Sequence, residues 1–297
     1  MNKFFLLLTL LCLSLSARAH DAEVDGIFYN LDVVNRTATV TGGYNVNSGD
    51  VVIPETVLYN GITFSVTSLG DYCFYGCSSL TSITIPNSVT SLGENCFYNC
   101  SSLTSLTIPN SVTSLGDFCF LACRSLTSIT ISNSVTSLGY QCFSYCSSLT
   151  SITIPNSVTS LGISCFWGCS RLTSITIPKS VTSLGEGCFS RCSSLTSITM
   201  LPSTPPSTGS GILDYTPLET VYVVDEDAKT AYQVKYPWHE YEIVVMQPTG
   251  IEDVETDKTA PTIVGYYDLN GKLINGKQRG AVIVRYSDGT TRKVLVK

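Results

Sequence analysis

The chain has 297 residues and a formal net charge of −6, and only 13% of its residues are charged, about half of the usual fraction. Nothing in it forms the basic stripe that nucleic-acid binding requires. Its two histidines, His20 and His239, leave the central segment without the base of a Ser-His-acid or Cys-His set. It contains no phosphate-binding loop or metal-ligand cluster. The composition therefore predicts a protein without enzymatic activity, cofactor or metal.

Residues 1–19 have the pattern of an export signal. A lysine is followed by the apolar run Phe4–Leu15, which is too short to span a bilayer, and by the small-residue cleavage site Ala17–Ala19. Cys12 raises the alternative of lipoprotein processing, but Leu11 precedes it where a small residue is expected. We predict cleavage at the end of this segment, which leaves an exported chain without a transmembrane segment.

Residues 20–65 contain short alternations of apolar and polar residues. Ile27–Val33 and Thr37–Gly43 have the pattern of paired strands, and Val51–Pro54 leads into the segment that follows. A repeat array has to cover its exposed ends. We therefore predict a β-rich N-terminal cap over 20–65.

A 23-residue unit then occurs six times, without insertion or deletion, across residues 66–201. Such a fixed period is typical of a solenoid, whose units bury their apolar sides by stacking on one another. Every unit contains the motif Cys-Phe-x-x-Cys, which we predict to form an inward-facing structural ladder. The residues of this ladder are Cys73, Phe74, Cys77, Cys96, Phe97, Cys100, Cys119, Phe120, Cys123, Cys142, Phe143, Cys146, Cys165, Phe166, Cys169, Cys188, Phe189 and Cys192.

The first unit shows how one rung of the solenoid is expected to fold. Leu80–Ile85 alternates and is rich in β-branched residues, which favours a strand, and Pro86 ends it. Cys73, Phe74 and Cys77 stand at i, i+1 and i+4, a spacing that suits one or two turns of helix. Each rung is therefore predicted to be a short strand plus a short helix, and the array an α/β solenoid.

The twelve cysteines of the array are expected to be buried thiols, because an unpaired cysteine packs as a small hydrophobe. Positions four apart within a unit are poorly aimed for a disulfide. Disulfides between rungs remain an alternative in an exported protein, because neighbouring strands lie about 4.8 Å apart. Zinc is a further alternative, although zinc sites use local clusters rather than a uniform ladder.

Two columns of hydroxyl side chains are predicted to face outward from the stacked strands, where they could contact a ligand. The alternative is that these hydroxyl groups only keep the sheet soluble. Tyr72, Tyr75 and Trp167, together with Tyr98, Leu121 and Ser144, are expected to face outward on the helix side, where the aromatic rings could stack on a ligand. The predicted binding columns are Ser82, Thr84, Ser105, Thr107, Ser128, Thr130, Ser151, Thr153, Ser174, Thr176, Ser197 and Thr199.

Four carboxylates of the array, Asp71, Glu94, Asp117 and Glu186, share one position of the repeat. We expect them to form a solvated face. Paired acids of the glycosidase type are the alternative, which spacing alone leaves open.

The phrases Val-Thr-Ser-Leu-Gly-x-x-Cys-Phe-x-x-Cys and Leu-Thr-Ser-Ile-Thr-Ile-Pro resemble the BspA-type leucine-rich repeats of bacterial surface proteins. The resemblance covers all six units and a degenerate seventh over 202–224, although members commonly have Ala-Phe where this chain has Cys-Phe. It implies a curved solenoid displayed outside the cell, with adhesion to host or neighbouring-cell surfaces as its role.

Residues 202–246 are predicted to contain this degenerate repeat and a C-terminal cap. Pro202–Gly211 has the composition of a loop, Thr220–Val224 of a strand and Glu226–Tyr236 of a short amphipathic helix. Trp238 and Tyr241 are expected to cover the last rung.

Residues 247–261 are polar and acidic without an apolar period, which predicts a linker. Residues 262–297 contain three predicted strands with tight turns at Asn270-Gly271 and Asp288-Gly289. This segment resembles the C-terminal sorting module of proteins exported through the type IX secretion system. A small β-module without a sorting role is the alternative.

These observations favour an exported, non-enzymatic binding or adhesion protein, secreted or held on the outer surface of a bacterium. Its expected partner is a protein or glycan on another cell or host surface. The alternative is a passive structural spacer or surface-layer component without a specific ligand. Ice binding is disfavoured, because a curved solenoid does not match a flat lattice.

Overall fold

The structure is a computed structural model that divides into two units, residues 1–245 and 246–297. The predicted export signal at 1–19 and the predicted linker at 247–261 lie outside the residues that it describes. None of the helices in the described part of the chain is long and apolar enough to cross a membrane. The described ranges are 20–42, 48–246, 263–267, 273–274, 280–286 and 291–296.

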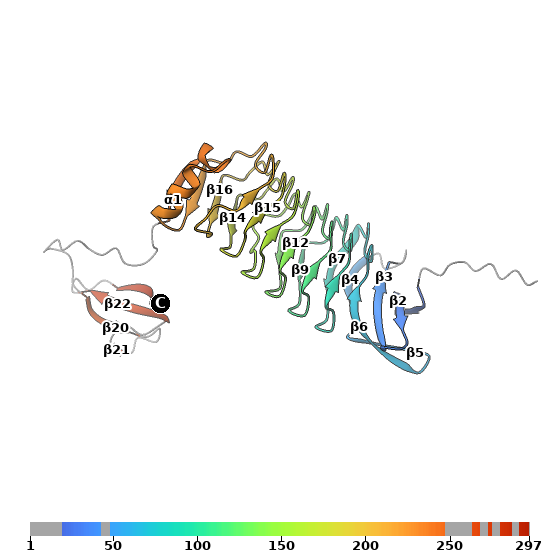
Figure 1. Cartoon of the computed structure of the whole chain (residues 1–297). Coiled ribbons are helices and arrows are strands. Elements are labelled where there is room, and N and C mark those ends of the chain that lie inside the picture. The colour runs from blue at the N-terminus through green and yellow to red at the C-terminus, as the bar shows by residue number, and fades with distance from the viewer. Residues whose placement is uncertain are drawn as a thin grey trace, which may run out of the picture. The chain divides into compact units, whose positions relative to one another are not determined.

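The repeats stack into a solenoid, as the 23-residue period predicted, and its strands run side by side along one wall (Figure 1). Where strands of neighbouring repeats pair, they lie parallel with a shift of one repeat, so that Ser128 is opposite Ser105 and Thr130 opposite Thr107. The rung at 151–154 contributes a single bridge between Thr153 and Thr176. We call this surface the strand wall. Its strands are β4 (Ser48–Val52), β7 (Ser79–Thr84), β9 (Ser105–Thr107), β11 (Ser128–Thr130), β14 (Ser174–Ile177), β16 (Ser197–Met200), β18 (Thr220–Val223) and β19 (Glu242–Val245).

A second row of parallel strands, only two residues each, precedes the Cys-Phe motif and was not predicted. Two residues are too few to show an alternation in the sequence. The glycine that follows each Ser-Leu pair is required because the rungs approach closely there: a Cβ on Gly116 would lie 2.5 Å from the carbonyl of Gly93. The strands are β8 (Ser91–Leu92), β10 (Ser114–Leu115), β12 (Ser137–Leu138), β13 (Ser160–Leu161), β15 (Ser183–Leu184) and β17 (Ser207–Thr208).

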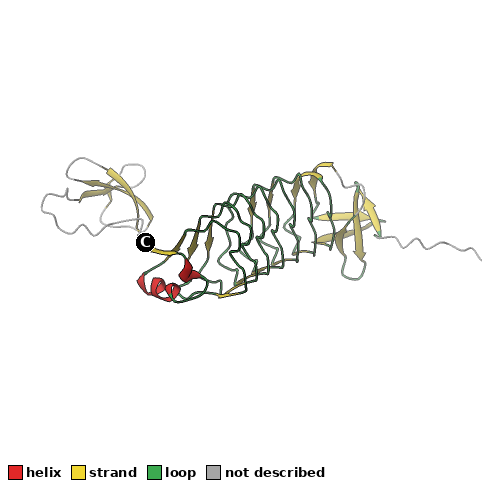
Figure 2. Cartoon of the chain, turned by 90° about the horizontal axis from the view of Figure 1, so that it is seen from above, coloured by secondary structure: helices red, strands yellow, loops and turns green. Residues whose placement is uncertain are grey.

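The short helix predicted at the Cys-Phe motif is wrong. The segment 71–78 and its equivalents form consecutive turns, which we call the turn wall, and the array is a β-solenoid. Cys77 N donates to Phe74 O within the rung at 3.1 Å, whereas Phe74 N donates to Cys96 O of the next rung at 2.7 Å. Every second N–H is thus directed along the solenoid and not into a helix. Figure 2 shows the helices confined to the C-terminal end of the solenoid.

Left-handed residues explain why the turn wall cannot be helical. Two positions of each rung have positive φ, for example Tyr72 at 56° and Gly76 at 69°. Non-glycine residues occupy the same positions in other rungs, such as Asn99 at 56° and Ala122 at 60°. The left-handed conformation reverses the direction of the backbone and ends any helical turn. The i, i+1, i+4 spacing of the motif fits both geometries, so the spacing alone could not decide between them.

A stack of phenylalanine rings fills the solenoid behind the turn wall. The rings of Phe74, Phe97 and Phe120 lie 5.3 Å apart with interplanar angles of 2° and 4°. The stack continues to Phe189 with spacings of up to 5.6 Å. All six rings are at most 1% exposed. Parallel rings at this spacing are offset-stacked, a favourable arrangement for aromatic pairs.

The N-terminal segment forms strands β1 (Ala22–Val24), β2 (Ile27–Asp32), β3 (Thr37–Thr41), β5 (Thr56–Tyr59) and β6 (Ile62–Leu69). The strands β2 and β3 pair antiparallel, as expected for 27–33 and 37–43, and β3 lies parallel to β6. Two further hairpins were not predicted, although Asp25-Gly26 and Asn60-Gly61 are the turn dipeptides that indicate them. All four of these turn residues have positive φ.

The C-terminal end of the first unit departs from the regular repeat. Pro202–Gly211, predicted to be a loop, contains β17, and Ser207 N donates to Thr182 O at 2.9 Å. Its proline content masked a strand of only two residues. The helix α1 (Glu226–Gln233) is capped by the Asp225 side chain and ends three residues earlier than predicted. It is followed by the 3₁₀ turn η1 (Trp238–Glu240), in which Trp238 is fully buried.

The second unit is a four-stranded antiparallel sheet in the order β21-β20-β22-β23. The three longer strands match the predicted ones. The turns predicted at Asn270-Gly271 and Asp288-Gly289 lie outside the described residues. The strands are β20 (Ile263–Tyr267), β21 (Leu273–Ile274), β22 (Gly280–Tyr286) and β23 (Thr291–Val296).

Candidate binding surfaces

The hydroxyl columns predicted for binding lie on the outside of the strand wall. Thr84, Thr107, Thr130, Thr153 and Thr176 are exposed, and Thr199 is half-buried. The isoleucine or leucine between each Ser and Thr faces the core and is buried, for example Ile129 at 7% exposure. Strand alternation therefore places both columns on one solvent face, with one Ser and one Thr per rung.

Hydrogen bonding distinguishes these columns from several other hydroxyls of the array. On the neighbouring columns, Thr159 Oγ1 donates to Thr136 O at 3.3 Å, and Thr127 Oγ1 donates to Thr104 O at 3.1 Å. Such hydroxyls are occupied by the preceding rung. Among the twelve hydroxyls of the two columns, only that of Ser82 bonds to another described residue, the Oδ1 of Asp50, at 2.7 Å. The remaining hydroxyls are available to solvent or to a ligand.

Carboxylates stand at both ends of the serine column. In the strand register Asp50 is opposite Ser82, and Glu242 is opposite Thr220, which continues the column. Hydrogen bonds from Ser82 and then Thr81 hold the pKa of Asp50 below its usual range. Both carboxylates lie outside the exact repeats, so only the strand register reveals their position.

Two of the four acids on the turn wall, Asp71 and Asp117, have a backbone role, whereas Glu94 Oε1 accepts the side-chain N–H of Asn95 at 3.0 Å. Asp71 Oδ1 accepts the N–H of Glu94 at 2.7 Å, and Asp117 Oδ1 accepts the N–H of Tyr140 at 2.8 Å. Each of the two aspartates thus satisfies a backbone donor of the next rung. The described residues contain no group of three or more His, Cys, Asp or Glu side chains able to hold a metal ion.

The twelve cysteines of the ladder are buried thiols in the structure. The second thiol of each rung from the second onward donates to the phenylalanine carbonyl of the preceding rung, as Cys100 Sγ does to Phe74 O at 3.1 Å. Burial raises the pKa of the Cys146 and Cys169 thiols far above the usual range, and that of Cys192 to about 12. Because the thiolate is the reactive species, these side chains are inert packing groups at neutral pH.

Aromatic and arginine side chains occupy the outside of the turn wall. Tyr75 and Tyr98 stack at 4.6 Å, and Tyr75 is 51% exposed. The equivalent residues of the next two rungs, Leu121 and Ser144, are buried and not outward-facing as predicted. Ser144 Oγ donates to Trp167 O at 3.1 Å, which draws this side chain inward.

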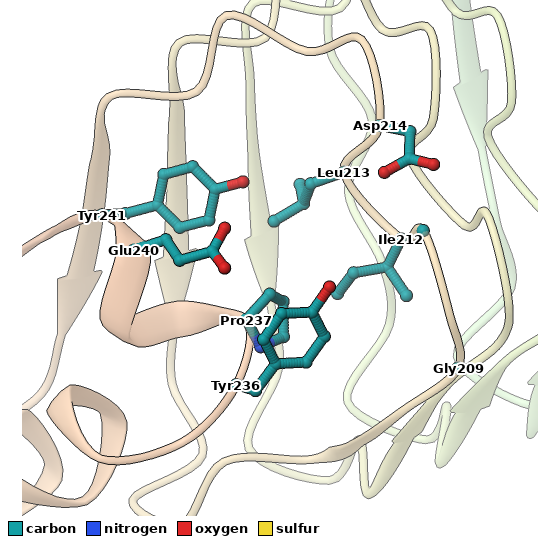
Figure 3. Close-up of a pocket in the computed structure, with 9 residues that line it drawn as sticks. Gly209, Ile212, Leu213, Asp214, Tyr236, Pro237, Glu240 and Tyr241 are labelled. Carbon is teal, nitrogen blue, oxygen red and sulfur yellow. The ribbon is translucent and has the colours of Figure 1, made fainter.

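A small cleft lies between the last repeat and the segment after α1 (Figure 3). Ile212, Leu213 and Pro237 line it together with other residues, and two carboxylates, Asp214 and Glu240, lie at its rim. Neither a cysteine nor a histidine lines the cleft. No third metal-binding side chain joins these carboxylates in the described part of the chain.

The sequence of the repeats matches the profile of a known protein family. The profile of the BspA type leucine-rich repeat region, a region of six copies, matches residues 58–170 and again residues 115–233. These matches together span more than half of the chain. The chain belongs to the BspA-type leucine-rich repeat family. No curated protein matches it significantly.

Solved structures of leucine-rich repeat proteins are similar to this chain. It is similar to the leucine-rich repeat protein of T. pallidum, with 27% identity, a TM-score of 0.61 and coverage of 73% of this chain and 97% of the other. It is also similar to a leucine-rich cell surface protein from Faecalibacterium prausnitzii, with 28% identity, a TM-score of 0.51 and coverage of 70% and 72%.

Proposed function

We propose that this BspA-type protein is an exported, non-enzymatic binding or adhesion protein that contacts a protein or glycan through its strand wall. The family match and the similarity to a cell surface protein support a place outside the bacterial cell. Residues 1–19 would serve as the export signal and residues 262–297 as a sorting module of the type IX kind. The small antiparallel sheet of the second unit is compatible with such a module.

One observation favours the strand wall as the binding surface. The hydroxyls of Thr130, Thr153 and Thr176 are exposed and have no hydrogen-bond partner among the described residues, whereas several hydroxyls of other columns, such as those of Thr159 and Thr182, bond to the preceding rung. A ligand can therefore bond to them without breaking a bond within the protein, and unpaired donors and acceptors cost little to desolvate when a ligand replaces water. A surface built only for solubility gives no reason for this difference between columns.

Replacing Thr130, Thr153 and Thr176 together by valine tests the proposal. Valine keeps the shape and strand preference of threonine but removes the hydroxyl. Full-length protein would be applied to an array of glycans and matrix proteins. We expect the native chain to bind a defined spot and the triple variant to lose at least about tenfold in affinity, since each bonded hydroxyl contributes about 0.5–1.5 kcal/mol.

The matched control replaces Thr136, Thr159 and Thr182 by valine. These threonines are also exposed, but they lie on a column in which Thr159 and Thr182 donate to the preceding rung. Binding should survive this change. An array without any specific spot would favour the passive spacer, and equal loss in both variants would show that the strand wall is not the site.

A further inference from the structure

A continuous row of arginine and aromatic side chains crosses the C-terminal half of the turn wall. The guanidinium of Arg124 lies 5.8 Å from the ring of Tyr145, whose edge meets the ring of Trp167 at 4.4 Å. The guanidinium of Arg191 lies 5.2 Å from Trp167 and 5.1 Å from Tyr215. We call these five residues the Arg-aromatic strip. They come from five successive rungs, so the strip is about 19 Å long at the usual strand spacing.

The strip is exposed although it is apolar in large part. Tyr215 is 77% exposed and Tyr145 is 39% exposed, and both arginines are exposed. Gly168 permits this arrangement, since a Cβ there would lie 3.1 Å from the Tyr145 ring. Exposed aromatic rings gathered in one place on a soluble protein indicate an interaction surface, where tyrosine, tryptophan and arginine are enriched.

The two guanidinium groups of the strip lack a carboxylate partner. Within the described part of the chain, neither Arg124 nor Arg191 forms an ion pair or a side-chain hydrogen bond. Asp214, the neighbour of Tyr215 in the chain, is turned toward Gly211, where an added Cβ would lie 2.7 Å from its Oδ2. The rings therefore hold the arginines in place while their N–H groups remain available.

We propose that the Arg-aromatic strip is a second binding site, distinct from the strand wall, for a polysaccharide that carries carboxylate groups. The arginines would pair with sugar carboxylates through two parallel N–H groups, and the tyrosine and tryptophan rings would stack on the C–H faces of the sugars. Arg124 and Arg191 are three rungs apart, about 14 Å, so a repeating polymer can reach both while a single sugar cannot.

The charges of the chain argue against a nucleic acid as the occupant. Nucleic-acid binding depends on many cations that neutralise closely spaced phosphates. The strip has two cations with aromatic surface between them, on a chain with a net charge of −6. A polymer with spaced carboxylates and neutral hydroxyls is the better match to this surface.

Titration calorimetry of the full chain with polygalacturonate at low salt tests the proposal. We expect binding that weakens with added salt, because exposed ion pairs are screened. Arg191→Gln should lower the affinity about tenfold or more, since hydrogen bonds to charged groups are strong. Tyr215→Ser should also weaken binding. Its side chain is largely exposed, so the fold should be retained, which the thermal unfolding midpoint would verify.

The matched control is Arg171→Gln, because Arg171 is an exposed arginine of the array outside the strip. Unchanged affinity in this variant supports the site, whereas an equal loss would indicate charge attraction alone and overturn the proposal. Absence of polygalacturonate binding, or equal or tighter binding of poly-glutamate or single-stranded DNA, would overturn it as well. The strand-wall variant Thr130→Val, Thr153→Val, Thr176→Val should bind polygalacturonate normally, which separates this proposal from the proposed function.

Discussion

The strand wall and the turn wall belong to the same rungs but differ in how their backbone groups form hydrogen bonds and in which side chains they bury. The strand wall pairs its strands in parallel and buries isoleucine and leucine. The turn wall alternates bonds within a rung and between rungs, and it buries cysteine and phenylalanine. The strand wall varies little on its outside, whereas the turn wall carries different side chains in each rung. Regular pairing thus accompanies a uniform surface, and the turns accommodate diversity.

The largest predicted effect is a loss of stability at alkaline pH, because the turn wall, unlike the strand wall, buries ionisable thiols in every rung. Burial raises the pKa of thiols such as Cys142, Cys146 and Cys165. Above about pH 8.5 the unfolded state loses these protons while the folded state keeps them, so stability falls as pH rises. The loss amounts to about 2 kcal/mol per buried thiol at pH 10. Urea unfolding under reducing conditions at pH 7 and pH 10 measures it.

The double variant Cys146→Ala, Cys169→Ala is the control for this effect. It should be less stable at pH 7 but should lose about 4 kcal/mol less than the native chain between the two pH values. Stability that is equal at pH 7 and pH 10 would show that the thiols are not buried as described.

The second effect compares the interior packing of the walls. Phe143→Ala should lower the free energy of unfolding by about 3–5 kcal/mol, because the ring stacks on Phe120 and on Phe166 and leaves a cavity. Phe189→Ala should cost less, since Phe189 stacks on a phenylalanine ring on one side only. Ile129→Val on the strand wall should cost about 0.5–1.5 kcal/mol. Denaturant unfolding of the three variants ranks them, and equal costs at both phenylalanines would contradict the stack.

The smallest effect concerns the left-handed backbone that every rung of the turn wall requires. Gly76 has φ 69° and open space around its Cβ position, so Gly76→Ala adds conformational strain without a clash. We expect a loss of about 1 kcal/mol in unfolding free energy. Gly76→Asn should cost less, because asparagine tolerates this conformation and occurs at the same position as Asn99. If alanine and asparagine were equally harmless, backbone strain would not shape the turn wall.

The sequence was sufficient to predict the strand wall. The period of 23, the alternation in Leu80–Ile85 and the stop at Pro86 together predicted parallel strands with Ser82 and Thr84 outside, and the structure places them there. These features are local and are repeated in every unit, so each copy supports the same interpretation.

The turn wall was harder to predict because its geometry depends on bonds between rungs. The Cys73–Cys77 spacing suited a helix, and the N–H groups that leave for the next rung cannot be read from one unit. A signal was nevertheless present: Gly76, Asn99 and Gly168 occupy one repeat position, and glycine and asparagine favour positive φ. The carboxylates Asp50 and Glu242 and the Arg-aromatic strip were missed for a related reason, since only the stacking register brings their members together.

The stacked phenylalanines also divide the interior of the solenoid into equivalent units, one for each rung. Because the interior of each rung accepts the rung before and after it in the same way, deleting residues 135–157 would bring Phe120 next to Phe166 and restore the stack. The interior therefore sets no preferred number of rungs, and the array can lengthen or shorten in steps of one unit. Its outside is not interchangeable: the same deletion removes Tyr145 and divides the Arg-aromatic strip. A change in the number of rungs would therefore alter the outer surface while leaving the interior packing the same.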